Sequence, residues 1–211
     1  MIGLGAYLAF LGVSLLVICT PGQDTALTIR NTLLGGRGAG VATALGVSSG
    51  QAVWTIATSA GLAVILGASA PLFLAIRLAG AAYLIYLGAR SLLSAARGSG
   101  PNNGRAAGRN RDRNAFAQGV LSNLSNAKMV AFFISLLPPF AGPHPSFLLL
   151  LALGCNFCLL TFAWLTGYAF AVEKMKRWLG GSAARRSIDG LLGAVLVALG
   201  VRVGAEALAS S

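Results

Sequence analysis

The sequence predicts an all-α integral membrane protein of six transmembrane helices, and three observations support this prediction. Of its 211 residues, 56% are apolar and only 10% are charged, and the mean hydropathy is +0.76. A soluble domain usually has about 25% charged residues, so most soluble protein classes are excluded. Six apolar stretches are also long enough to cross about 30 Å of hydrocarbon as helices, which takes about 20 residues. We therefore expect a single transmembrane domain over 1–211.

The six predicted spans follow one another with short connections, apart from one longer loop. The spans cover 4–34, 41–66, 72–95, 116–140, 146–172 and 188–208. The loop, 98–114, is rich in Gly, Asn and Arg and cannot build a core, so a flexible cytoplasmic segment is expected. It either determines topology or binds anionic lipid headgroups, and we favour topology. It separates a first three-helix half (1–97) from a second one (115–211).

The basic residues predict which side of the membrane each connection faces. Thirteen of the 16 lie close to or beyond the ends of the first, third and fifth spans. Because positively charged connections stay on the cytoplasmic side, both termini are expected to face outward. The net charge of +11 then reflects orientation, and no nucleic-acid partner is expected. The thirteen residues are Arg30, Arg37, Arg90, Arg97, Arg105, Arg109, Arg111, Arg113, Lys174, Lys176, Arg177, Arg185 and Arg186.

Weak internal similarities relate the two halves. Phe10 precedes Pro21 by eleven residues, and Phe116 precedes Ala127 by the same interval. With three spans in each half, the second half must enter the membrane from the opposite side. Inverted repeats of this kind are typical of secondary transporters, whose binding site lies near the midplane where the repeats meet.

The first span is expected to break at Pro21-Gly22. Proline lacks a backbone N–H and clashes with the preceding turn, and 31 residues in one straight helix would be about 46 Å long. Irregular backbone at membrane depth must be surrounded by protein or a water-filled cavity. The free N–H groups where the helix restarts suit a carboxylate. Pro21, Gly22 and Gln23 are therefore candidate substrate-binding residues.

Two charged residues lie inside the predicted spans at similar depth. Asp24 directly follows the break, and intramembrane acids tend to be functional; a helix N-cap is its simpler role, and the two roles are compatible. Lys128 lies in the fourth span within Asn126-Ala127-Lys128. It either snorkels to the interface or lines a polar pathway with Asp24 as its partner, and we favour the pathway. Asn126 is a candidate beside it.

Two amides, Gln51 in the second span and Asn156 in the fifth, are further candidates because a buried amide needs several partners. Cys155 and Cys158 form a C-x-x-C motif, but buried thiols in a membrane helix usually act as small apolar side chains. We therefore expect no metal site and no cofactor. No catalytic constellation is present, so an enzyme is not expected, and transport would be driven by a gradient.

These motifs resemble the LysE/RhtB family of bacterial amino-acid exporters, over nearly the whole chain. The Pro-Gly-Pro-Asp/Asn signature of the family's first helix is Pro21-Gly22-Gln23-Asp24 here, and its third-helix pattern Gly-Ala-Ala-Tyr-Leu-x-Tyr-Leu-Gly is present at 80–88. The Asn-Pro-Lys motif of the fourth helix is Asn126-Ala127-Lys128. Since the proline at this position is lost, we expect a weaker kink in the fourth span.

The resemblance implies export of an amino acid across the bacterial inner membrane, driven by the proton motive force, with periplasmic termini. The substrate carboxylate is expected at the N–H groups of the break and at Lys128, and its ammonium at Asp24. Asp24 is also the expected carrier of the coupling proton, because burial disfavours the charged form of a carboxyl. A single acid favours a neutral substrate such as threonine or homoserine.

Two other functions stay open at this point, as does the oligomeric state, for which a homodimer is considered. One is a metal-cation exporter of the same superfamily. The other is an electron carrier resembling the thiol–disulfide transporter DsbD, since Cys19 lies beside Pro21. The fourth span has no cysteine to complete a redox pair, so this second alternative is the weaker.

Overall fold

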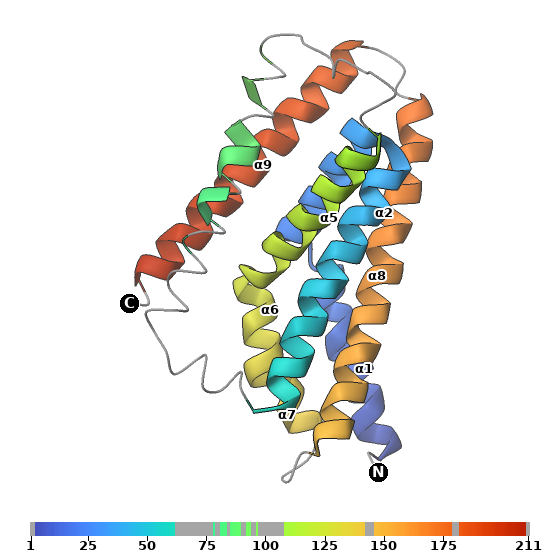
Figure 1. Cartoon of the computed structure of the whole chain (residues 1–211), viewed down its shortest axis with the longest axis vertical. Helices are drawn as coiled ribbons and strands as arrows, with labels where there is room; N and C mark the ends of the chain where they lie inside the picture. Colours follow the sequence, from blue (N-terminus) through green and yellow to red (C-terminus); the bar gives the residue numbers. More distant parts are fainter. Residues whose placement is uncertain are drawn as a thin grey trace.

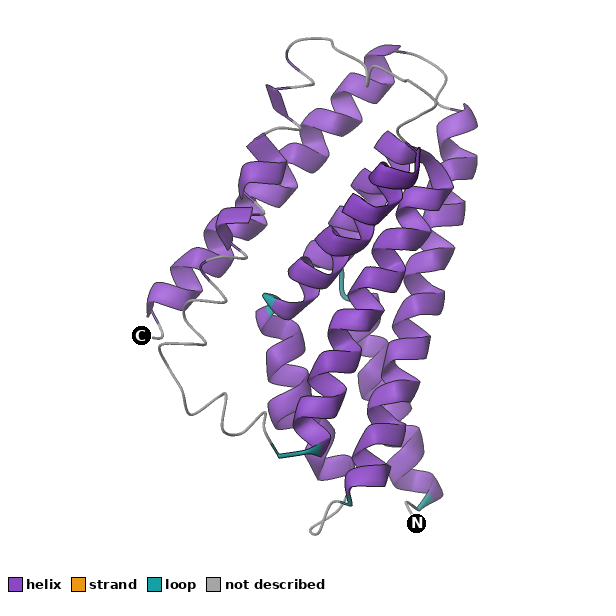
Figure 2. Cartoon of the chain, viewed as in Figure 1, coloured by secondary structure: helices purple, strands orange, loops and turns teal. Residues whose placement is uncertain are grey.

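The chain forms an all-helical bundle (Figure 1) in a computed structural model. The model describes residues 3–61, 78, 81–83, 85–89, 92–93, 96, 108–141, 146–178 and 182–209. Figure 2 shows helices joined by short connections and no strand in this part of the chain. Most of the predicted third span, and the loop 98–107, lie outside the described residues. The elements are α1 (Leu4–Cys19), α2 (Gln23–Ser59), α5 (Gly108–Leu124), α6 (Ala127–Ala131), the π-helix η2 (Phe132–Leu136), α7 (Leu137–Phe140), α8 (Phe147–Trp178) and α9 (Ser182–Ala209).

The predicted break in the first span is present. α1 ends at Cys19, Thr20 is extended, and α2 begins at Gln23 with Gly22 as its N-cap. The Thr20 hydroxyl donates to the carbonyl of Leu16 (2.7 Å) and so satisfies one carbonyl at the end of α1. The proline between the two helices cannot donate a backbone hydrogen bond, which explains why the helix does not continue.

α2 consists of two antiparallel arms, 23–35 and 37–59, which meet at Gly36. The backbone of Gly36 has φ 81° and ψ −177°, a region that only glycine enters readily. Asn31 and Thr43 are twelve residues apart, about 18 Å along a straight helix, yet their side chains are hydrogen-bonded at 2.9 Å. The first arm thus completes the first predicted span, and the second arm runs back as part of the second (Figure 1).

A second break lies between α5 and α6, where the segments 112–124 and 128–140 meet at 56°. The sequence predicted a weaker kink here than in typical members of the family that it resembles, because position 127 is not a proline, and this comparison stays a prediction. Asn126 caps α6, since its side-chain oxygen accepts a hydrogen bond from the backbone N–H of Lys128 (3.1 Å). A capping asparagine starts a new helix without any proline.

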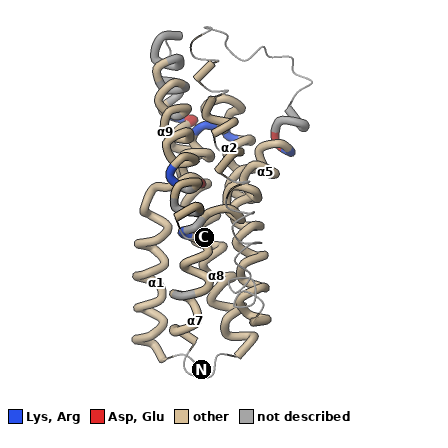
Figure 3. Tube along the Cα trace, turned by 90° about the vertical axis from the view of Figure 1, so that its left-hand side faces the viewer, with Lys and Arg blue, Asp and Glu red and all other residues tan. Residues whose placement is uncertain are grey.

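Within the described residues, one helical segment, Phe147–Met175, is by itself long and apolar enough to cross a membrane. Two bent pairs reach the same criterion if each pair counts as one span: α1 with α2, and the segments on either side of the α5–α6 break. The fold is thus that of an α-helical membrane protein, and the six-span layout remains a prediction. In Figure 3 the coloured charged residues gather in the upper part of the bundle, while the lower ends of α1 and α7 carry none.

The second arm of α2 packs directly on the backbone of α5 through glycines. A Cβ atom built on Gly46 would lie 2.1 Å from the carbonyl oxygen of Phe116, and one built on Gly119 would lie 2.3 Å from that of Thr43. Neither glycine can therefore be enlarged without moving a helix. Gly46 and Gly119 thus allow the two helices to approach closely.

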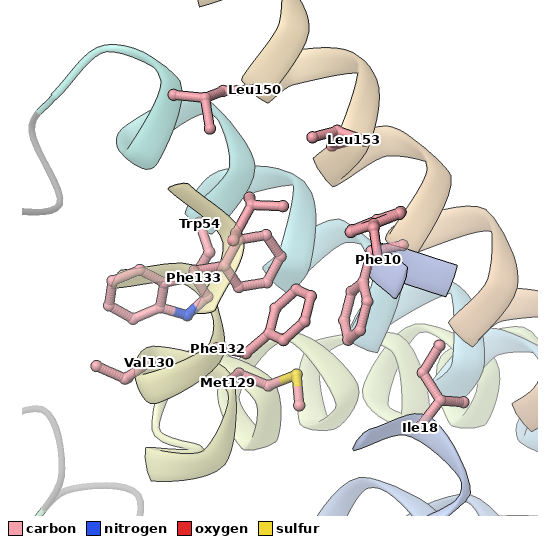
Figure 4. Packing of buried hydrophobic residues seen from close by; sticks show 11 residues of the cluster. Phe10, Ile18, Trp54, Met129, Val130, Phe132, Phe133, Leu150 and Leu153 are labelled. Carbon is pink, nitrogen blue, oxygen red and sulfur yellow. The ribbon is translucent and has the colours of Figure 1, made fainter. Parts of the chain in front are cut away.

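An aromatic cluster fills the lower half of the bundle (Figure 4). Phe132 stacks on Phe157 with ring centroids 4.0 Å apart, and Phe133 meets both rings edge to face. Phe132 and Phe133 begin the π-helix, whose wider turn is often found at functional sites. The cluster comprises Phe10, Ile18, Trp54, Met129, Val130, Phe132, Phe133, Leu137, Leu150, Leu153 and Phe157.

A smaller apolar cluster attaches α9 to the first arm of α2. Leu27 of that arm is completely buried and belongs to one cluster with Leu196 of α9 and with Leu87. α9 lies along one side of the bundle in Figure 1. The first arm, which carries the candidate acid, is therefore held from two sides, by α5 and by α9.

We expect Gly46→Ala to destabilise the protein, because the added methyl group meets backbone that cannot rotate away. Overpacking of this kind costs about 1–3 kcal/mol. The matched control is Gly12→Ala, since a Cβ at Gly12 has no atom within 4 Å and alanine favours helix over glycine. Thermal unfolding in detergent should show a lower midpoint for Gly46→Ala only. Equal midpoints for the two variants would contradict the observed packing.

Candidate functional site

The two helix breaks meet in space, and Asp24 lies where they meet. Its carboxylate is buried and accepts three hydrogen bonds from the end of α5 and the α5–α6 junction. Ser122 donates to Oδ1 (2.6 Å), while Asn123 (3.0 Å) and Asn126 (2.9 Å) both donate to Oδ2. All three donors are neutral, so this shell binds a carboxylate without cancelling its charge.

Asp24 is not the N-cap of α2, and that part of the prediction was wrong. The helix already begins at Gln23, its N-cap is Gly22, and no side chain caps it. Asp24 lies in the first turn, where the positive end of the helix dipole stabilises a carboxylate, and its side chain reaches over to α5. The neighbouring Gln23 strengthens the same contact, since its amide nitrogen donates to the carbonyl of Ser122. Pro21, the remaining candidate of this motif, is exposed.

Lys128 reaches across to the end of α1. Its Nζ donates to the carbonyl oxygens of Val17 (3.0 Å) and Thr20 (2.9 Å), which have no partner further along their own helix. The side chain passes close to Gly22, since a Cβ there would lie 3.5 Å from Nζ, an ordinary contact. A cation at a helix C-terminus is favourable. Lys128 thus binds α1 rather than snorkelling, and it forms no ion pair with Asp24.

Gln51 approaches the same place from the second arm of α2. It is 1% exposed, and its Nε2 donates to Thr161 Oγ1 (3.2 Å) and lies 3.4 Å from the sulfur of Met129. Its Oε1 is buried without a hydrogen-bond partner. An unpaired buried acceptor costs about 1–3 kcal/mol of stability. A bound ligand that donates a hydrogen bond to Oε1 would remove that cost.

These side chains line a small pocket of about 20 Å³. That volume holds about one water molecule, so an amino acid does not fit in this conformation. Polar groups line one part of the cavity and apolar groups the rest, with Phe157 linking it to the aromatic cluster below. The lining residues are Ile18, Asp24, Thr25, Gln51, Lys128, Met129, Phe157, Thr161 and Leu165.

The structure brings together most of the predicted site residues, and the exceptions are Pro21, which is exposed, and Asn156. Asp24, Gln51 and Lys128 line the cavity. Asn126 donates to Asp24 itself, and Gln23 donates to the carbonyl of Ser122, which in turn binds Asp24. Asn156 does not join them, because its amide donates to the Tyr7 hydroxyl (2.7 Å) at the other end of α1.

The three cysteines lie on α1 and α8. Cys19, Cys155 and Cys158 are free thiols, and Cys155 is exposed. Cys158 lies 3.7 Å from the hydroxyl of Thr55, an ordinary contact between neighbouring helices. Within the described residues no three His, Cys, Asp or Glu side chains lie close enough to hold a metal ion.

Sequence reasoning missed Ser122 and Asn123, which supply two of the three hydrogen bonds to Asp24. A signal was present, because five of the seven residues from Ser122 to Lys128 are polar in the middle of an apolar stretch. Such a dense run at membrane depth needs internal partners. Of this run, only Asn126 and Lys128 were predicted as site residues.

Comparison with known proteins gives consistent results. The family model of the LysE type translocator matches residues 15–207. The "Uncharacterized membrane protein YrhP" of Bacillus subtilis (strain 168) is 30% identical over 204 residues, which cover 93% of this chain and 97% of that relative. The homoserine/homoserine lactone efflux proteins of Salmonella typhimurium (strain LT2) and Salmonella typhi are 27% and 26% identical over 195 residues, covering 92% of this chain and 93% of each relative. No solved structure matches the chain.

We expect Lys128→Met to destabilise the structure, because it leaves the carbonyls of Val17 and Thr20 without their donor. The loss should be about 1.5–3 kcal/mol, the usual contribution of hydrogen bonds to a charged group. Lys174→Met serves as the control, since Lys174 is exposed near the end of α8. Chemical unfolding in detergent measures both variants. A Lys128→Met protein as stable as the control would show that the contact with α1 is dispensable.

Proposed function

Since the chain belongs to the family of LysE type translocators, we propose that it exports a small neutral amino acid across the bacterial inner membrane, driven by the proton motive force. The observation that carries this proposal is the small pocket beside the two helix breaks, with Asp24 and Lys128 in its wall. The names of the two Salmonella relatives, both efflux proteins for homoserine and its lactone, support the same substrate class.

The cavity offers separate partners for the two ends of an amino acid. An ammonium group would donate to Asp24 and to the unpaired Oε1 of Gln51. A carboxylate would accept from the N–H groups in the first turn of α2, which lack partners within the helix, and from Lys128. The apolar wall around Phe157 and Leu165 would receive the side chain.

A neutral substrate follows from the count of charges around the cavity. Asp24 is the one acidic side chain among the residues that line it, and Lys128 is the one basic side chain. A second ammonium or a guanidinium on the substrate would have no acidic partner, and burying an unpaired charge is costly. The site therefore favours homoserine or threonine over lysine or arginine.

Asp24 is the proposed carrier of the coupling proton, and alternating exposure of the cavity would couple its protonation to substrate movement. In this scheme proton and substrate ammonium compete for the same carboxylate, which is the simplest form of antiport. The termini would face the periplasm, as the distribution of basic residues predicts.

An uptake assay in inside-out membrane vesicles tests this function, because export from the cell becomes uptake into the vesicle. With an acidic interior, vesicles that carry the protein should accumulate radiolabelled homoserine or threonine, and unlabelled lysine should not compete. Asp24→Asn should lower the rate about tenfold or more, as expected for loss of a charged hydrogen-bond partner worth about 1.5–3 kcal/mol. Asp112→Asn, at the start of α5 and away from the cavity, should transport normally.

Three other outcomes are informative. Uptake that does not respond to the gradient would contradict proton coupling. Equal uptake by wild type and Asp24→Asn would remove Asp24 from the mechanism. If no amino acid accumulates in wild-type vesicles, the proposed substrate class is wrong, and metal cations would be the next class to assay.

A further inference from the structure

Asn123 is a buried amide that uses only one of its two ends. The side chain is completely buried, and its Nδ2 donates to Oδ2 of Asp24. Its Oδ1 has no hydrogen-bond partner and lies against Gly50 of the second arm, 3.0 Å from where a Cβ would be. The acceptor end of the amide is therefore buried next to the carboxyl group and unused.

The shell around Asp24 is arranged for the ionised carboxylate, since Ser122, Asn123 and Asn126 all donate to it. The Ser122 hydroxyl can also accept, but it contacts Oδ1, so a proton on Oδ2 needs an amide oxygen. A protonated carboxyl gains a donor of its own and needs an acceptor. Asn126 cannot supply one by turning its amide, because its oxygen caps α6 through the backbone N–H of Lys128. Asn123 can turn, because its oxygen has no partner to lose.

We propose that Asn123 positions the coupling proton by turning its side-chain amide, donating to ionised Asp24 and accepting from protonated Asp24. The step is balanced: a proton from water binds Oδ2, the bond from Asn123 Nδ2 breaks, and a bond from Oδ2–H to Asn123 Oδ1 forms. Because amide oxygen and nitrogen have nearly the same shape, the turn requires no repacking. This inference rests on the proposed role of Asp24 as proton carrier.

The surroundings of Asp24 allow such a change to be observed in isolation. The charged group that faces Asp24 is Lys128 of α6, held by the carbonyls of α1. The cavity-lining residues from α1, the second arm and α8 are uncharged: Ile18, Gln51, Phe157, Thr161 and Leu165. After the turn, the amide nitrogen would face Gly50, beside which the carbonyl of Val120 also lies, 3.2 Å from the same Cβ position.

Infrared difference spectroscopy of the full-length protein in lipid vesicles tests the proposal, with buffer stepped from alkaline to mildly acidic. Wild type should gain a band of a protonated carboxyl that is lost in Asp24→Asn. An amide band that shifts on labelling asparagine with heavy isotopes should change in the same step. That amide change should be lost in Asn123→Leu and kept in Asn156→Leu, the same substitution at an amide bound to Tyr7. Asn123→Ser replaces Asn123→Leu if the leucine variant does not fold.

The other outcomes separate this inference from the proposed function. A carboxyl band without a change in the asparagine amide would overturn the role of Asn123 and leave Asp24 as the proton carrier. A carboxyl band that is altered by Ser122→Ala and not by substitution of Asn123 would assign the acceptor role to the Ser122 hydroxyl instead. If no band depends on Asp24, both the inference and proton carriage by Asp24 fail, while amino-acid uptake in vesicles is judged separately.

Discussion

The whole arrangement depends on one constraint, which is that backbone groups freed at a helix break inside a membrane must find partners within the protein. Here the two helix breaks lie next to each other, and each supplies hydrogen-bond partners for the other. Lys128 from the second break binds the carbonyl end of α1, and the end of α5 binds Asp24 beside the first break. Asn126 connects both sides, since one end of its amide binds Asp24 and the other caps α6. The polar site is thus also the structural junction.

Sequence reasoning predicted the parts of this junction that follow from a single residue type. Pro21 and Gly22 indicated a break, and Asp24 and Lys128 stood out as charges in apolar spans. The size of the bend at Asn126 could not be predicted from the sequence, because an asparagine caps a helix only where the chain has already turned, and neighbouring helices decide that. Asn123 was missed for a similar reason, since an amide within a helix shows its function only once its partner is known. Asp24 and Lys128 were expected to be partners, but they form no ion pair because backbone carbonyls of α1 bind the Lys128 ammonium.

The cavity has a polar boundary on one side and an apolar boundary on the other. On one side, hydrogen bonds between α5 and the first arm of α2 join charged and polar groups that water could also solvate. On the other side, Phe157, Phe132 and Phe133 form a layer of rings that excludes water. Separating the first boundary exchanges protein partners for water at modest cost, whereas separating the second exposes apolar surface. The two boundaries therefore differ in the free energy needed to separate them.

The glycine contacts between α5 and the second arm of α2 also limit how the protein can move. Where backbone lies on backbone, as at Gly46 and Gly119, two helices cannot slide past each other or rotate without first separating. This pair therefore behaves as a fixed frame. Motion that opens the cavity is then expected outside this pair, in the remaining helices. The absence of a side chain at two glycines thus distinguishes a rigid helix pair from the helices packed around it.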